Sequence, residues 1–310
     1  MIKNLNNLSK TDIDIAGGKG ASLGEMTRVG MAVPPGFVVL ASAFDRFLEE
    51  TNLSADIDKI LKGVKIEDTK SIDKASNKIR ALIWKVNFPN DIAEEIKKEF
   101  IKLQAPLVAV RSSATVEDSS TASWAGELES YLNTTEATLL DSVKKCWSSL
   151  FTPRAIFYRF ENDLYNQKVS VAVVVQKMVQ SEISGIAFTV HPVTENRDHM
   201  VIEAGYGLGE AIVGGMVTPD TYVISKKNKT ILDKNISKQK MMIVRSPKGT
   251  KEKVVPKIKQ SEQKLADKKI FELAEICKNI EKHYKKPQDI EWALEKGKFY
   301  ITQARPITTL

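Results

Sequence analysis

The stretch DIEWALEKGKFYITQAR, residues 289–305, decides the fold class of this chain. Apolar and polar residues alternate on both sides of a glycine-containing turn, which is typical of two antiparallel strands joined by a tight hairpin. Six more short strands are predicted between residues 169 and 244, and one long helix is predicted over 261–284. Strands joined by tight turns as well as by helices favour an α+β fold over a doubly wound parallel sheet.

The register of this closing hairpin brings polar side chains together. If Lys296-Gly297-Lys298 forms a three-residue loop, Glu291 and Gln303 lie opposite each other on one face of the hairpin. Arg305 shares that face at a period of two. A carboxylate, an amide oxygen and a guanidinium at one place suit Mg²⁺ and phosphate groups, although a structural salt bridge would show the same pattern.

The first half of the chain is predicted to be mostly helical. Helical periodicity appears near residues 21–28, 41–50, 72–85, 91–103 and 139–150, with short strands at 37–40 and 107–111. The character changes near 180–185, so the predicted lobes are residues 1–182 and 183–310. A cleft between two α+β lobes would be the natural place for a ligand.

Two segments of the first lobe carry features that suit phosphate. Gly17-Gly18-Lys19-Gly20 precedes a helix, so backbone N–H groups and a lysine could turn towards an anion. The spacing excludes a Walker A loop, because Ile13 stands where that motif requires glycine. Arg111 closes an apolar strand, where a guanidinium is well placed for a bidentate phosphate contact. A glycine-rich surface turn and a surface loop are the structural alternatives.

A third glycine cluster, Gly205-Tyr206-Gly207-Leu208-Gly209, follows a predicted strand. It lacks the spacing of a dinucleotide-binding loop. Close backbone packing or a tight strand-to-helix turn is therefore the favoured interpretation.

The net charge of +7 is concentrated in one segment. Residues 226–259 hold twelve Lys or Arg and two acids, which leaves the rest of the chain near −3. A nucleic-acid or membrane surface would be one explanation. The segment lacks interleaved aromatic residues and an amphipathic helix pattern, so a solvated lysine-rich hairpin or loop, with no nucleic acid and no membrane, is favoured.

Composition also limits the cellular setting. The two cysteines, Cys146 and Cys277, are far apart and form no disulfide framework or metal motif. The first residues do not read as a signal peptide, and the apolar runs are far short of the roughly 20 residues of a membrane span. These observations predict a soluble, cytoplasmic protein.

Taken together and in order, the motifs resemble one family, the ATP-grasp nucleotide-binding domain of phosphoenolpyruvate synthase (pyruvate, water dikinase) and its relatives. Those relatives include pyruvate phosphate dikinase and the rifampin phosphotransferases. The resemblance runs nearly end to end. It is carried by GGKGASLGEM (17–26), VPPGF (33–37), VAVRSSATVED (108–118), SLFTPRAIFYR (149–159), VVVQKMV (173–179), SGIAFTVHP (184–192), GLGEAIVGGMV (207–217), DIEWAL (289–294) and ITQARPIT (301–308).

The resemblance implies a role for each matching position. Lys19 and Arg111 would hold the ATP phosphates and act in catalysis, and Arg305 would be a further phosphate contact. Gly126 and Ser130 would belong to a loop that covers the triphosphate. The edge of Gln176-Lys177-Met178-Val179 would read adenine. Glu291 and Gln303 would be the Mg²⁺ ligands, in agreement with the hairpin register.

The resemblance further implies an ATP-dependent phosphotransferase with two lobes and a nucleotide cleft between them. The phosphate acceptor would be a histidine on a swivelling domain that lies outside this sequence, as does the pyruvate-binding domain. Both could belong to a longer chain or to a separate one. Two alternatives stay open: the same module in a rifampin phosphotransferase, and a non-catalytic nucleotide-sensing module.

Overall fold

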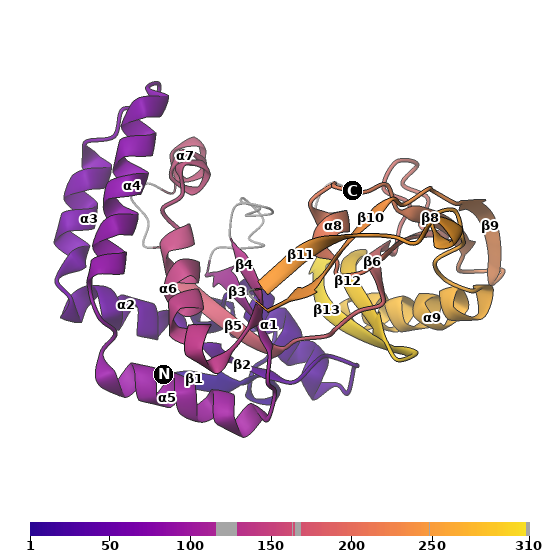
Figure 1. Ribbon diagram of the computed structural model, residues 1–310, viewed down its shortest axis with the longest axis horizontal. Helices are drawn as coiled ribbons and strands as arrows, with labels where there is room; N and C mark the ends of the chain where they lie inside the picture. Colours follow the sequence, from indigo (N-terminus) through magenta and orange to yellow (C-terminus); the bar gives the residue numbers. More distant parts are fainter. Residues whose placement is uncertain (116–128, 163, 165–168, 248, 308–310) are drawn as a thin grey trace. The chain divides into compact units, whose positions relative to one another are not determined.

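The computed structural model describes residues 1–115, 129–162, 164, 169–247 and 249–307 (Figure 1). Contacts divide the chain into two compact units. Unit 1 consists of Met1–Arg28 and Pro35–Met178, and unit 2 of Val29–Pro34 and Val179–Leu310. The sequence placed the boundary between residues 182 and 183 and kept 29–34 in the first lobe. A backbone hydrogen bond ties residues 29–34 to unit 2, because the Ile301 N–H donates to the Ala32 carbonyl (2.9 Å).

Unit 1 is built on a five-stranded sheet in the order β1-β2-β5-β3-β4, and every neighbouring pair is antiparallel. The strands are β1 (Ile2–Asn4), β2 (Gly36–Val39), β3 (Val108–Ala114), β4 (Ser130–Thr134) and β5 (Val171–Lys177). The helices are α1 (Ile13–Arg28), α2 (Ala41–Glu50), α3 (Leu53–Lys62), α4 (Thr69–Lys85), α5 (Asn90–Leu103), α6 (Leu139–Ser149) and α7 (Pro153–Glu161).

The core of unit 1 lies between this sheet and helices that include α2, α5 and α6. Alternate residues of β3 and β5, such as Val110 and Val173, are fully buried in it. Trp147 of α6 stacks on Phe47 with a centroid distance of 4.9 Å and on Phe88 at 5.0 Å. The helix predicted from residue 21 begins earlier, at Ile13, because helical turns lie on both sides of a kink at Gly17 (φ 69°, ψ 169°).

Unit 2 is built on a six-stranded antiparallel sheet in the order β13-β12-β6-β7-β8-β9. The strands are β6 (Ile183–Phe188), β7 (His199–Tyr206), β8 (Asp220–Ser225), β9 (Thr230–Asn235), β12 (Gln288–Glu295) and β13 (Lys298–Pro306). Two further strands, β10 (Met241–Ser246) and β11 (Gly249–Val254), form a separate antiparallel ribbon. The helices are the short α8 (Glu210–Val213) and the long α9 (Asp267–Tyr284).

Helix α9 covers one face of the six-stranded sheet. Its apolar stripe includes Ile270, Leu273 and Cys277, all fully buried. Lys269 of the same helix lies over the ring of Phe299 (5.3 Å), which identifies the sheet face that α9 contacts. The prediction of an α+β fold is confirmed, since antiparallel sheets and segregated helices make up both units. Within the described part of the chain, no helix combines the length and the apolar character needed to cross a membrane.

Candidate functional site

Two cationic side chains of unit 1 lie at the contact between α1 and β3. Residues of β3 alternate between the two faces of the sheet. Ser112 points to α6, where its hydroxyl lies 3.0 Å from the Ser149 hydroxyl. Arg111 and Ser113 therefore face α1, which carries Lys19. The Lys19 ammonium donates to the Ser112 carbonyl (3.0 Å), so the two predicted phosphate-binding residues come from neighbouring elements.

The glycine cluster allows α1 to lie directly on β3. The Ser113 hydroxyl accepts a hydrogen bond from the Gly20 N–H (3.1 Å) and donates to the Ala16 carbonyl (2.9 Å). A Cβ on Gly17 would lie only 2.2 Å from the Ser113 Oγ, and the φ of Gly17 is +69°. Only glycine fits both conditions, so this cluster has a steric role whether or not it also binds an anion.

The positive charges of Lys19 and Arg111 influence the pKa of the buried thiol of Cys146. Burial raises the pKa of Cys146 to about 12, while the charges of Lys19 and Arg111 act in the opposite direction. Arg111 is itself only 9% exposed.

The other predicted residues of unit 1 share the face of Arg111. Ser130 of β4 pairs with Arg111, and Gln176 of β5 pairs with Ala109, two positions away. Gln176 is buried and Ser130 is exposed. The Met178 N–H donates to the Leu107 carbonyl (3.0 Å).

Two predicted residues stand apart from this group. Val179 is the first residue of the second stretch of unit 2 and is buried, with 8% exposed. Gly126 lies outside the described residues.

In unit 2, the closing hairpin contains the predicted pair. Glu291 lies opposite Gln303, which confirms the cross-strand prediction. The predicted three-residue loop, however, is wrong. The loop has two residues, Lys296 and Gly297, with φ values of 50° and 74°. Two consecutive positive φ values are typical of the type I′ turn that two-residue hairpins prefer.

A β-bulge restores the predicted register. Pairing shifts between Glu291 and Trp292, so that Trp292 pairs with Ile301 and Thr302 is the extra residue on β13. Without this residue, a strict period of two would place Gln303 on the same face as Ile301, which is fully buried. The bulge therefore turns Gln303 to the face of Glu291, opposite α9.

Arg305 has a partner that the sequence analysis missed. Its guanidinium makes two hydrogen bonds to one carboxylate oxygen of Asp289, at 2.9 and 2.7 Å. Burial raises the pKa of Asp289, and the charge of Glu291 adds to this, whereas Arg305 lowers it. The hairpin register could have found Asp289, since it lies opposite Arg305 in the same way that Glu291 lies opposite Gln303.

The third glycine cluster is held by tight backbone contacts. The Gly207 carbonyl accepts hydrogen bonds from the hydroxyls of Ser181 (2.9 Å) and Ser184 (2.8 Å). A Cβ on Gly207 (φ +89°) would lie 2.4 Å from the Ile243 carbonyl oxygen. Close backbone packing, the favoured interpretation of this sequence, is what the structure shows.

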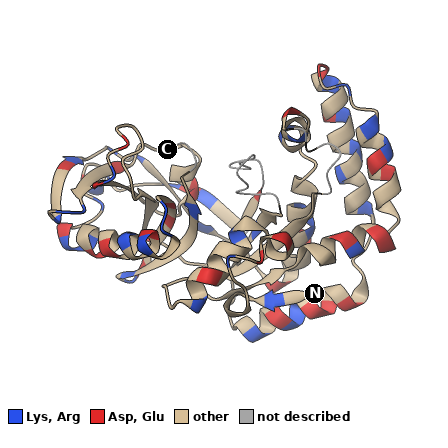
Figure 2. Cartoon of the chain, turned by 180° about the vertical axis from the view of Figure 1, so that it is seen from behind, with Lys and Arg blue, Asp and Glu red and all other residues tan. Residues whose placement is uncertain are grey.

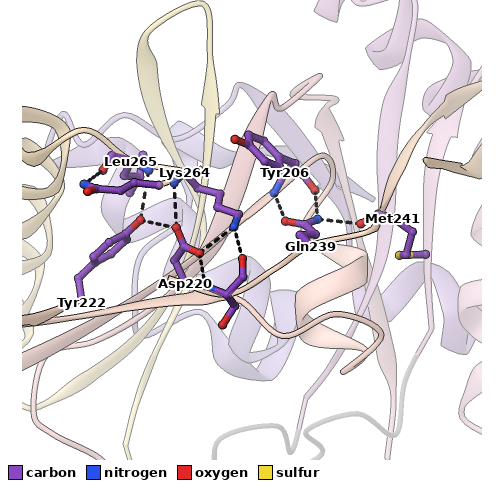
Figure 3. A network of polar contacts seen from close by, with 9 residues as sticks. Tyr206, Asp220, Tyr222, Gln239, Met241, Lys264 and Leu265 are labelled. Atoms are coloured by element: carbon purple, nitrogen blue, oxygen red, sulfur yellow. Dashed lines mark hydrogen bonds and ion pairs between the residues drawn. The ribbon is translucent and has the colours of Figure 1, made fainter. Parts of the chain in front are cut away.

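A buried polar network supports this cluster (Figure 3). Gln239 forms hydrogen bonds with both the N–H (2.8 Å) and the carbonyl (3.0 Å) of Tyr206. Nearby, Lys264 and Asp220 form an ion pair of 2.9 Å with no exposed side-chain surface. The Tyr222 hydroxyl donates to the same carboxylate (2.8 Å), and Lys264 lies over the ring of Tyr206 (5.6 Å).

The basic segment, residues 226–259, has two parts that differ in how their lysines are paired with acidic residues. In the first part, three lysines form ion pairs with α9, where acidic and basic residues lie side by side (Figure 2). These pairs are Lys226 with Glu281, Lys229 with Glu275 and Lys234 with Asp267. In the second part, the exposed Lys251 and Lys253 of β11 have no ion-pair partner among the described residues. The local pairing supports a solvated, lysine-rich surface in the first part.

Unit 2 carries a carboxylate and an amide on one face of its sheet, and unit 1 carries an arginine on β3 and a lysine on the helix packed against it. Carboxylate and amide oxygens are ligands of hard cations, and guanidinium groups bind phosphates. The chain belongs to the corresponding family: residues 13–310 match the family described as pyruvate phosphate dikinase, AMP/ATP-binding domain. The suspected resemblance is thereby confirmed.

Curated relatives share this domain at high identity. A probable phosphoenolpyruvate synthase of Methanocaldococcus jannaschii is 51% identical over 99% of this chain and 26% of that protein. The phosphoenolpyruvate synthase of Pyrococcus furiosus is 42% identical over all of this chain and 44% of that protein. The rifampicin phosphotransferase of Bacillus subtilis is 40% identical over all of this chain and 36% of that protein. The chain thus spans less than half the length of each of these relatives.

Proposed function

We propose that this chain is the ATP-binding module of a phosphoenolpyruvate synthase-like phosphotransferase. It would transfer phosphate from Mg·ATP to a histidine on a swivelling domain outside this sequence, with a pyruvate-binding domain as a further partner. The observation that carries the proposal is the arrangement of opposite charges within a family of AMP/ATP-binding domains. Lys19 of α1 and Arg111 of β3 are cations on neighbouring elements of unit 1, and Asp289 and Glu291 are carboxylates on one face of the hairpin of unit 2, beside the amide of Gln303.

The residues of unit 1 would bind the organic and phosphate parts of ATP. Lys19 and Arg111 would neutralise the charge that develops on the phosphates during transfer, which is the main requirement of phosphoryl transfer. Gly126 and Ser130 would contribute to the cover over the triphosphate. Gln176, Met178 and Val179 would line the edge of the adenine.

The hairpin residues of unit 2 fit a magnesium ion. Glu291 supplies a carboxylate and Gln303 an amide oxygen on the same face, and hard oxygen donors are what Mg²⁺ prefers. When bound, the ion would hold phosphate oxygens and lower their negative charge. Arg305, positioned by Asp289, would contact a phosphate from the neighbouring row of the hairpin.

One observation favours a second candidate within the same chemistry. The similarity to the rifampicin phosphotransferase covers the whole of this chain and is nearly as high as that to the P. furiosus synthase. The domain outside this sequence would then bind an antibiotic in place of pyruvate. The ATP-binding roles proposed above are the same for both candidates.

Calorimetric titration of Mg·ATP into the purified chain tests the proposal. We expect binding that weakens at least tenfold in Glu291→Ala and without Mg²⁺, and that is lost in Arg111→Ala. Circular dichroism must show that each variant keeps its fold. A well-folded wild-type chain that binds no ATP would refute the proposal. If the chain binds ATP, phosphate transfer to a separately expressed histidine domain would distinguish a transferase from a nucleotide sensor.

A further inference from the structure

The helix that carries Lys19 is broken at one residue. Helical turns lie on both sides of Gly17, whose own backbone (φ 69°, ψ 169°) is not helical. Residues 18–28 therefore form a helix of their own, with Gly17 at the N-cap position and Lys19 as the second residue. The first N–H groups of a helix have no carbonyl in a preceding turn to accept them. The side chain of an N-cap residue usually accepts one of these hydrogen bonds, but glycine has no side chain.

A hydroxyl from β3 supplies the missing cap. The Ser113 Oγ accepts a hydrogen bond from the Gly20 N–H (3.1 Å) and donates to the Ala16 carbonyl (2.9 Å), so one hydroxyl spans the break in the helix. An N-cap side chain binds the N–H of the second or third helical residue, and Gly20 is the third. Ser113 is fully buried, so water does not replace this contact. Ser113 therefore makes the N-cap contact from a distant part of the sequence.

The same strand also holds the ammonium group of Lys19. The Lys19 Nζ donates to the carbonyl of Ser112, the residue before Ser113 (3.0 Å). The N–H that Ser113 accepts belongs to the peptide group between Lys19 and Gly20, so this hydroxyl fixes the backbone next to the Lys19 Cα. Arg111 precedes both serines on β3. Three consecutive residues of one strand thus supply one proposed phosphate-binding cation and fix the other at two points.

The capping contact is separate from the close packing of α1 on β3. A Cβ on Gly17 would lie 2.2 Å from the Ser113 Oγ, but also 2.4 Å from the Ser113 carbonyl oxygen. An alanine at position 113 would therefore leave the backbone contact with Gly17 in place and remove only the hydroxyl. The steric role of Gly17 and the hydrogen-bonding role of Ser113 can be tested independently.

We propose that Ser113 is a positioning residue that holds Lys19 in place for the phosphates of the nucleotide, by capping the helix that begins after Gly17. The inference rests on the proposed function, because it assumes that Lys19 binds these phosphates. The first turn of a helix without its cap frays, and the turn must then be ordered again when the nucleotide binds. This cost falls on ligands that contact Lys19 and spares those that do not.

Binding of ATP and of adenosine, which has no phosphate, tests this role by calorimetry. An N-cap side chain contributes about 1 kcal/mol, which corresponds to about fivefold in affinity. Ser113→Ala should weaken ATP by about that factor and leave adenosine unchanged. In a chain that carries Lys19→Met, Ser113→Ala should have no further effect on ATP, because it acts through Lys19. Ser113→Cys, which keeps a weaker acceptor, should give a smaller loss even if the alanine variant folds poorly.

Thr152→Ala is the matched control, because it removes an N-cap hydroxyl of unit 1 at a helix without proposed site residues. The Thr152 Oγ1 accepts a hydrogen bond from the Ala155 N–H (3.1 Å) at the start of α7. Both variants should lower the melting temperature, but only Ser113→Ala should change the preference for ATP over adenosine.

Three results would overturn the positioning role of Ser113. They are equal weakening of both ligands by Ser113→Ala, an unchanged affinity for ATP, and a full effect of Ser113→Ala in the Lys19→Met chain. A wild-type chain that binds no nucleotide would instead overturn the proposed function, and this inference with it.

Discussion

The cationic region of unit 1 and the acidic row of unit 2 carry opposite charges, and different structural features position them. Lys19 and Arg111 depend on a helix that approaches a strand so closely that only glycine fits at position 17. Glu291 and Gln303 depend on strand register and on one bulge. The first arrangement is set by a steric contact, and the second by the pairing of the sheet.

This difference indicates how each region should respond to mutation. A close helix–strand contact is sensitive to a single added methyl group. Side chains on the face of a sheet can be substituted with little effect on the fold. Their positions depend instead on the interactions that hold the strands and their connecting segments in place. In unit 2, the buried ion pair of Lys264 and Asp220 is such a support, since it lies beside the end of β7 (Figure 3).

The largest effect is expected for Lys264→Met. This change leaves the fully buried carboxylate of Asp220 without its cation, and breaking a buried pair in this way costs about 3–5 kcal/mol. The unfolding free energy should fall by that amount in urea titrations followed by circular dichroism. Lys229→Met provides the matched control, because its exposed pair with Glu275 should contribute about 1 kcal/mol or less. Similar losses in both variants would show that the buried pair does not support unit 2.

The next largest effect is expected for Gly17→Ala, with Gly30→Ala as its control. Both glycines have positive φ values, +69° and +77°, but only Gly17 has atoms within 4 Å of an added Cβ. Gly30→Ala should therefore cost about 1 kcal/mol from backbone strain alone. Gly17→Ala should cost about 3 kcal/mol or more, because strain and overlap with Ser113 add together. Equal melting temperatures for the two variants would contradict the steric role of this contact.

A medium effect is expected for Arg305→Met. Without the guanidinium, the carboxylate of Asp289 keeps its burial and its repulsion by Glu291, so its pKa should rise further above its ordinary value. A raised carboxyl pKa in the folded state lowers stability as the pH rises through that window. The variant should thus be about 1–2 kcal/mol less stable than the wild type at pH 7 and nearly equal at pH 4. A deficit that does not change with pH would mean that Arg305 stabilises the hairpin by packing alone.

The hairpin shows how far the sequence could predict this site. Alternation predicted both strands, and the pair of Glu291 and Gln303 was correct. The assumed three-residue loop was wrong, but the bulge at Thr302 adds the one residue that the shorter loop removes. A bulge depends on packing against α9 and β6, which no local pattern reveals. Glu203 was missed because its place beside the hairpin depends on pairing with β6, whereas Asp289 could have been found from the hairpin register, which places it opposite Arg305.

In unit 1, the sequence recognised the glycine cluster and a possible phosphate role, but not its steric role. The sequence suggested backbone groups turned towards an anion, whereas the structure shows Gly17 packed on Ser113, a residue 96 positions further along. Such a contact is set by tertiary structure and leaves no local signature. Likewise, no change in composition marks Val29–Pro34 as part of unit 2. This segment is tied to unit 2 by a tertiary contact, the backbone hydrogen bond from Ile301 to Ala32, which the local sequence does not reveal.

The smallest expected effect, and the one of opposite sign, concerns Glu203→Gln in the absence of nucleotide. The folded chain raises the pKa of Glu203 above its ordinary value of 4.5, so the unfolded state loses this proton first and stability falls as the pH rises through the window above 4.5. Glutamine removes this loss while keeping the shape of the side chain. The variant should therefore be slightly more stable than the wild type at pH 7.5, by less than about 1 kcal/mol, and equal to it near pH 4. Urea titrations at both pH values measure the difference, with Glu252→Gln as the exposed control. A less stable variant at pH 7.5 would show that Glu203 has a compensating partner in the folded chain.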